Sequence, residues 1–200
     1  MSRLVFGIGF NDNKYPTKID GRNREEYNAW SRMLQRCTEK FWQVHPSYVG
    51  TTCSDNFKSY SYFYEWYHNQ QTSNKIDENN NKWHLDKDLL SPQSVKIYSE
   101  DTCVFLPHSI NSLLIKRVSK RGECPIGVDW RDGRNKYRAA CNIEKGINQH
   151  LGYFDSKEDA FQAYKRFKEC LVKYIANKYK DQLEPRAYEA LMKYQVNISD

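Results

Sequence analysis

Long apolar runs are missing from this chain of 200 residues. No segment approaches the roughly 18 apolar residues that a membrane-spanning helix requires. The apolar stretch Leu4-Val5-Phe6-Gly7 is also too short for the core of a secretory signal peptide. We therefore expect a cytoplasmic protein with no membrane partner.

Cysteine is also scarce, since the chain has six cysteines at irregular intervals and no Cys-x-x-Cys pair. This excludes the dense disulfide framework of a small secreted domain. Cys37, His45, Cys53 and Cys103 nevertheless form a Cys₃His set that is able to bind a structural Zn²⁺, although their spacing lacks a zinc knuckle. Buried free thiols are the commoner explanation for such cysteines.

The composition excludes a disordered chain, because 39% of the residues are hydrophobic and 14% are aromatic. Charge is unevenly distributed along the sequence. Residues 120–180 contain 14 Lys or Arg and 8 Asp or Glu, whereas the remaining 139 residues contain 17 of each kind. The whole excess positive charge of +6 therefore lies in one stretch, and a basic stretch of this kind favours a polyanionic partner such as nucleic acid.

Alternating residues in this basic stretch predict three antiparallel strands. The first covers residues 126–131, turns at Asp132-Gly133 and leads into a second over residues 136–143. A further turn at residues 144–146 leads to a third strand over residues 147–154. Ser156 then provides a helix N-cap, and apolar residues recur at helical spacing from Ala160 to Ile175. The pattern predicts three strands followed by one packed helix.

The two faces of the second strand differ in chemistry. Tyr137, Ala139, Cys141 and Ile143 alternate with Lys136, Arg138, Ala140 and Asn142. Arg and Asn at alternate positions of an exposed sheet are suited to the major groove, where they bind guanine and adenine edges. The alternative interpretation is an ordinary solvated strand face.

These motifs resemble an AP2 domain, a family known from plant transcription factors and from mobile endonucleases of phages and bacteria. The similarity lies in Gly127-Val128, Lys136-Tyr137-Arg138-Ala139 and the string from His150 to Ser156, and it covers about a quarter of the chain. It implies a sheet that contacts double-stranded DNA with a helix behind it. The residues that it places against DNA are Trp130, Arg131, Arg134, Lys136, Arg138 and His150. Asp129 departs from the arginine that plant members usually carry there.

The N-terminal part carries a second set of candidate residues. His84, Asp86 and Asp88 would share one face of an extended strand, and His108 and Asn111 would share one face of a helix that begins near Pro107. Oxygen ligands from Asp86, Asp88 and Asn111 are suited to Mg²⁺ or another divalent cation, which would activate a water molecule beside it.

This arrangement resembles phage HNH-type endonucleases that carry a C-terminal AP2 domain, through the residues from Tyr27 to Cys37 and the Leu85-Asp86-Lys87-Asp88 segment. The resemblance implies a ββα site with Asp86 on the metal and His84 or His108 as general base, and one such site nicks more readily than it cuts both strands. Two positions depart from the family. Lys87 stands where the basic His is expected, and Thr102 stands where an Asn is expected. A protonated lysine is a poor general base.

We therefore predict an α+β protein with an HNH-like region over residues 1–116, a hinge over residues 117–124, an AP2-like domain over residues 125–180, and a C-terminal helix and tail over residues 181–200. The expected function is that of a DNA-binding, metal-dependent phage endonuclease or its degenerate relative, located in the host cell cytoplasm. One alternative is a catalytically inactive DNA-binding regulator. Another is a phage protein that binds and interferes with a host defence factor, with exposed tyrosines as interface anchors.

Overall fold

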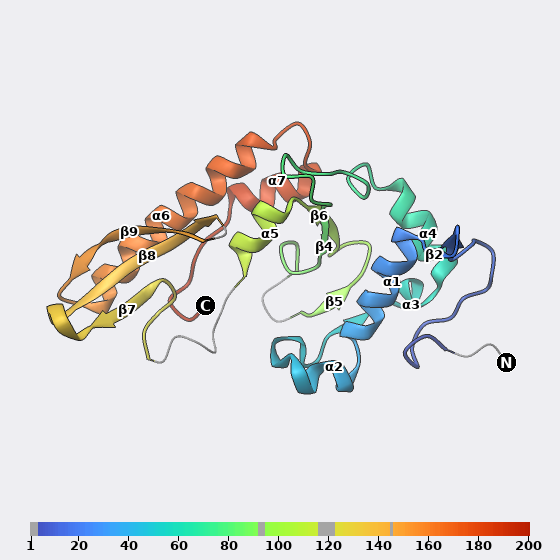
Figure 1. Ribbon diagram of the computed structural model, residues 1–200, viewed down its shortest axis with the longest axis horizontal. Helices are drawn as coiled ribbons and strands as arrows, with labels where there is room; N and C mark the ends of the chain where they lie inside the picture. The colour runs from blue at the N-terminus through green and yellow to red at the C-terminus, as the bar shows by residue number, and fades with distance from the viewer. Residues whose placement is uncertain (1–3, 92–94, 116–122, 145) are drawn as a thin grey trace. The chain divides into compact units, whose positions relative to one another are not determined.

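The structure, a computed structural model, describes residues 4–91, 95–115, 123–144 and 146–200 (Figure 1). It combines helices with small sheets, which confirms the α+β class. The chain divides into two compact units between Leu106 and Pro107. Within the described ranges, no helix combines the length and the apolar character needed to cross a lipid bilayer.

The first unit contains short elements around an aromatic core. Its helices are α1 (Glu25–Arg36), α2 (Glu39–Val44), the 3-10 turn η1 (Pro46–Tyr48), α3 (Asp55–Lys58) and α4 (Tyr60–Asn69). Its strands are β1 (Lys18–Ile19), β2 (Arg22–Asn23), β3 (Thr52–Cys53), β4 (His84–Asp86), β5 (Ile97–Tyr98) and β6 (Val104–Leu106). Trp30 of α1 is fully buried beside Tyr60 of α4, and its indole Nε1 donates a hydrogen bond to the carbonyl oxygen of Phe57 at 2.8 Å. Helices α1 and α4 thus form the centre of this unit.

The strands of the first unit pair as three separate ribbons. Strands β1 and β2 form an antiparallel hairpin, β3 pairs with β5 in parallel, and β4 pairs antiparallel with β6. In the last ribbon Leu85 lies opposite Phe105, and all of β6 is buried. The ribbon from β4 to β6 thus holds the segment that carries His84 and Asp86.

The second unit is built on one antiparallel sheet in the order β7-β8-β9, with β7 (Val128–Arg131), β8 (Lys136–Glu144) and β9 (Ile147–Phe154). Helix α6 (Lys157–Lys178) packs on one face of this sheet through Ala160, Phe161 and Tyr164. The Ser156 hydroxyl accepts a hydrogen bond from the backbone N–H of Asp159 at 3.0 Å and so caps the helix. The predicted three strands and packed helix are confirmed.

Helices α5 and α7 also lie in the second unit, and they correct the expected boundaries. Helix α5 (His108–Leu114) buries Ile110 and Leu113 and packs with α6 and β8, so it belongs to the second unit and not to the N-terminal region ending at residue 116. Helix α7 (Pro185–Met192) packs with α6, and Val196 joins the core beneath the sheet. Residues 181–200 are therefore part of this unit. Residues 117–122, most of the expected hinge over residues 117–124, lie outside the described residues.

Candidate nucleic-acid interface

The face of the three-stranded sheet that points away from α6 is polar. Because Val128 and Ala139 pair and are buried on the helix side, alternation places their neighbours Asp129 and Arg138 on the opposite side. The same rule assigns the following residues to this outer face: Asp129 and Arg131 of β7, Lys136, Arg138, Ala140 and Asn142 of β8, and Asn148, His150 and Tyr153 of β9. Several cationic side chains therefore gather on one exposed surface.

Asp129 joins the two central arginines of the outer face. Asp129 and Arg138 are directly opposite in the β7–β8 pairing, and Arg138 donates from Nε and Nη2 to Oδ1 of Asp129 at 3.0 and 2.9 Å. The other carboxylate oxygen, Oδ2, lies 2.6 Å from Nε of Arg131. One carboxylate thus holds two guanidinium groups, and the three side chains are 42% (Asp129), 43% (Arg131) and 29% (Arg138) exposed.

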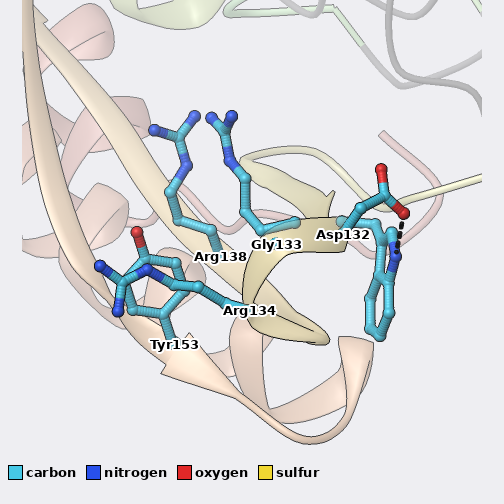
Figure 2. A pocket seen from close by; sticks show the side chains of 7 residues that line it. Asp132, Gly133, Arg134, Arg138 and Tyr153 are labelled. Atoms are coloured by element: carbon cyan, nitrogen blue, oxygen red, sulfur yellow. Dashed lines mark hydrogen bonds between the residues drawn. The ribbon is translucent and has the colours of Figure 1, made fainter.

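The remaining cations surround this central group. The guanidinium of Arg134 lies over the ring of Tyr153, 4.6 Å from its centroid, and the ring of His150 lies 4.7 Å from that of Tyr153. Lys136 forms an ion pair with Asp155 at 2.7 Å. Figure 2 shows Arg134 against Tyr153 with Arg138 extending from the middle strand nearby. Cations and aromatic rings, the two kinds of group that bind phosphates and bases, thus lie side by side.

A shallow pocket of about 440 Å³ opens at the turn between β7 and β8 and is lined by Arg131, Arg134, Arg138 and Tyr153 together with the turn residues and Trp130. Trp130 pairs with Tyr137, which packs on the helix side, and its indole donates to Asp132 at 2.9 Å. The expected DNA-facing Trp130 therefore lies on the other side of β7 from Arg131, at the rim of the outer face. Its indole is held by the turn.

The candidate nuclease residues of the first unit have structural contacts. Asp86 is 9% exposed, and its Oδ2 accepts hydrogen bonds from the backbone N–H groups of Asp88 and Leu89 at 2.9 and 2.8 Å. Burial raises the pKa of the Asp86 carboxyl above its ordinary value. Strand β4 ends at Asp86, so Asp88 lies outside it. The prediction that Asp88 shares one strand face with His84 and Asp86 is therefore wrong. The Asp86 carboxylate thus stabilises the turn that follows β4.

Lys87 and Thr102, the two residues that differ from the expected nuclease motif, also have structural contacts. Lys87 is 4% exposed, pairs with Asp88, and its Nζ lies 5.5 Å from the ring centroid of Tyr98 and 5.7 Å from that of Tyr48. Thr102 is buried, donates from its hydroxyl to the carbonyl of Ile97 at 2.7 Å, and accepts from the backbone N–H of Ser99 at 3.1 Å. Both side chains hold loops together.

The other expected members of the metal site lie on a different unit of the protein. His108 and Asn111 are on α5 in the second unit, whereas His84, Asp86 and Asp88 are in the first. The structure thus does not place the two parts of the predicted site within one compact unit.

The cysteines of the expected zinc set are distributed over three segments. A hydrogen bond shared by the thiols of Cys37 and Cys53 raises the pKa of Cys37 and lowers that of Cys53, and burial raises the pKa of Cys103 to about 12. His45 has its ring 4.3 Å from that of Phe41. In the part of the chain that the structure describes, no group of three or more His, Cys, Asp or Glu side chains is arranged to hold a metal ion.

Two contributors to the outer face were absent from the sequence-based set. Tyr153 stacks with Arg134, and Asp129 orients Arg131 and Arg138. The predicted hairpin already contained a signal for Asp129, because a charged residue at alternate positions of one strand faces its counterpart on the next strand. Tyr153 could not be assigned in this way, because the register of β9 shifts between Ala139 and Ala140 of the neighbouring strand.

Comparisons of the chain with protein-family models, curated proteins and solved structures give no match.

Proposed function

We propose that this protein binds double-stranded DNA through the outer face of its three-stranded sheet, in the manner of an AP2 domain. The observation that carries the proposal is the joint placement of Arg131, Arg138 and Lys136 on an exposed sheet face whose opposite side is sealed by α6. A sheet face of this kind enters the major groove, where arginine forks bind guanine O6 and N7.

Net charge supports the same assignment. Residues 107–200 carry 18 Lys or Arg and 12 Asp or Glu, whereas residues 1–106 carry 13 of each. The excess of +6 thus resides in the unit that carries the sheet. Cations that neutralise phosphates release counterions from the duplex, so such binding weakens steeply as salt rises.

The proposal is tested by fluorescence anisotropy with a labelled G·C-rich duplex of about two helical turns, titrated at several salt concentrations. We expect Arg138→Ala to weaken binding by roughly tenfold, the scale of one arginine contact to a base. Arg166→Ala is the matched control, since Arg166 is exposed on α6, the helix behind the sheet, and its loss removes the same charge. Equal affinities for both variants, or no binding by the natural protein at low salt, would reject the proposal.

DNA cleavage is a second candidate function, favoured by the chain order of the antiparallel β4–β6 ribbon followed by α5, which is the order of a ββα nuclease motif. The contacts of Asp86, Lys87 and Thr102 favour instead a DNA-binding regulator that keeps this segment as a scaffold. In an active protein, Asp86 and Asp88 of the first unit would hold Mg²⁺ or another divalent cation, and His84 of the same unit would deprotonate water.

Incubation with supercoiled plasmid in Mg²⁺ or Mn²⁺ distinguishes these two functions. We expect intact plasmid together with a gel shift, because the Asp86 carboxylate caps a turn and Lys87 is a poor general base. Metal-dependent nicking that disappears in Asp86→Asn, a change of charge at nearly constant shape, would establish the nuclease instead.

A further inference from the structure

The centre of the outer face contains two arginines, Arg131 and Arg138, with the carboxylate of Asp129 between them. Oδ1 of Asp129 accepts hydrogen bonds from Nε and Nη2 of Arg138, and Oδ2 forms an ion pair with Nε of Arg131 at 2.6 Å. These three side chains therefore carry a net charge of about +1 instead of +2 at neutral pH. These contacts with Asp129 do not involve Nη1 of Arg138 or either Nη atom of Arg131.

This arrangement prepares the arginines for one kind of partner. A guanidinium group that is anchored through Nε has its remaining N–H donors directed outward as a fork, and this fork matches the O6 and N7 acceptors of guanine. Anchoring also reduces the rotamer entropy that each arginine loses when it binds. An unanchored pair of arginines would instead follow the strongest negative charge nearby, which on a duplex is phosphate.

We propose that Asp129 is a specificity-determining residue: it fixes the forks of Arg131 and Arg138 for guanine edges and weakens the attraction of phosphate to the centre of the outer face. This inference rests on the proposed binding of duplex DNA. The Asp129 carboxylate is itself 42% exposed, so it also accepts a hydrogen bond from the N4 amino group of a cytosine at the same level. The preferred site therefore contains G·C pairs at the positions under these three side chains.

The test uses the full chain and two variants that lose the same charge. Asp129→Asn removes the charge of the bridging carboxylate at nearly constant shape. Asp181→Asn is the matched control, because Asp181 is exposed in the same unit beyond the end of α6. Each protein is used to select duplexes from a random pool, and dissociation constants are then measured for the selected duplex and for the random pool across a range of salt. Thermal melting curves establish that all three proteins are folded.

We expect the natural protein and Asp181→Asn to select the same G·C-containing site. For Asp129→Asn, the ratio of the two dissociation constants falls by roughly tenfold, the scale of losing one oriented arginine fork. Binding of the random pool becomes tighter, and the slope of log K against log salt becomes steeper by about 0.9, because one more phosphate is neutralised.

The possible outcomes distinguish a failure of this inference from a failure of the proposed DNA binding. If Asp129→Asn selects the natural site with an unchanged ratio, Asp129 has no role in specificity although the protein binds DNA. The same conclusion follows if the ratio of the two dissociation constants falls equally in Asp129→Asn and Asp181→Asn, since an equal fall reflects overall charge. If the natural protein binds no duplex at any salt concentration, the proposed function itself fails and the inference fails with it.

Discussion

At the residue scale, Gly127 shows how a single position fixes the sheet against its helix. Gly127 has a φ of +75°, and a Cβ built on it would collide with the ring of Tyr164 on α6. We expect Gly127→Ala to lower the free energy of unfolding by roughly 2–5 kcal/mol, because it adds left-handed backbone strain to an overpacked contact. Urea denaturation measures the change. Gly133→Ala is the control, since a Cβ there meets nothing within 4 Å, and a loss as large as that of Gly127→Ala would contradict the explanation.

Lys168 is a buried cation in the second unit. It lies on α6, is 6% exposed, and burial lowers its pKa from the ordinary value of 10.5. Between the lowered pKa and 10.5 the unfolded chain binds more protons than the folded protein, so this group makes the free energy of unfolding rise as pH rises through that window.

We therefore expect Lys168→Met to be more stable than the natural protein at pH 7, by on the order of 1 kcal/mol, and the difference to narrow as pH approaches that of an ordinary lysine. Urea denaturation of both proteins at neutral and alkaline pH measures this. A constant difference at all pH values would show that the effect comes from packing and not from the charge.

At the scale of elements, the second unit was largely predictable and the first was not. Alternating residues and the Ser156 cap predicted β7, β8, β9 and α6 because these elements repeat one pattern over many residues. The turn after β7 differs from the predicted Asp132-Gly133 turn, since it is Asn135 that adopts the left-handed conformation, with a φ of 50°. The register shift between β8 and β9 depends on packing, and no periodic pattern in the sequence indicates it.

The strands of the first unit are only two or three residues long, so they provide no alternation for a sequence-based prediction. Asp86 illustrates the consequence for the candidate site. Its residue type and its neighbours suggested a metal ligand, whereas its position at the end of a three-residue strand makes it the acceptor for two backbone N–H groups of the following turn. Lys136 and Arg138 of the outer face were easier to place, because the strand period alone assigns them to the face opposite Ala139.

At this scale we predict that helix α5 contributes to the stability of the second unit. Ile110 and Leu113 are buried, and α5 packs with α6 and β8. We expect a fragment of residues 107–200 to unfold cooperatively, and a fragment of residues 125–200 to be less stable by roughly 3–6 kcal/mol, because two large apolar side chains lose their burial. Guanidinium denaturation followed by circular dichroism compares the two fragments. Equal stabilities would mean that the unit begins after α5, near the boundary that the sequence suggested.

At the scale of the whole molecule, charge and exposure assign different tasks to the two units. The first unit is electrically neutral in sum and is built around an aromatic core, whereas the second carries the entire net charge of +6 and the outer face. This distribution supports the proposal that the second unit binds DNA, and that proposal does not require the first unit to cleave it. Under this proposal, we expect the contact with DNA to be confined to the outer face of the second unit.

Chemical footprinting of lysines tests this central claim most directly. The protein is acetylated with and without a saturating DNA duplex at low salt, and modification of each lysine is quantified by mass spectrometry. Lys136 lies on the outer face with 42% of its side chain exposed, whereas Lys180 is exposed beyond the end of α6. We predict that the duplex protects Lys136 and leaves Lys180 unprotected. Protection of Lys180 with Lys136 still fully reactive would contradict the account.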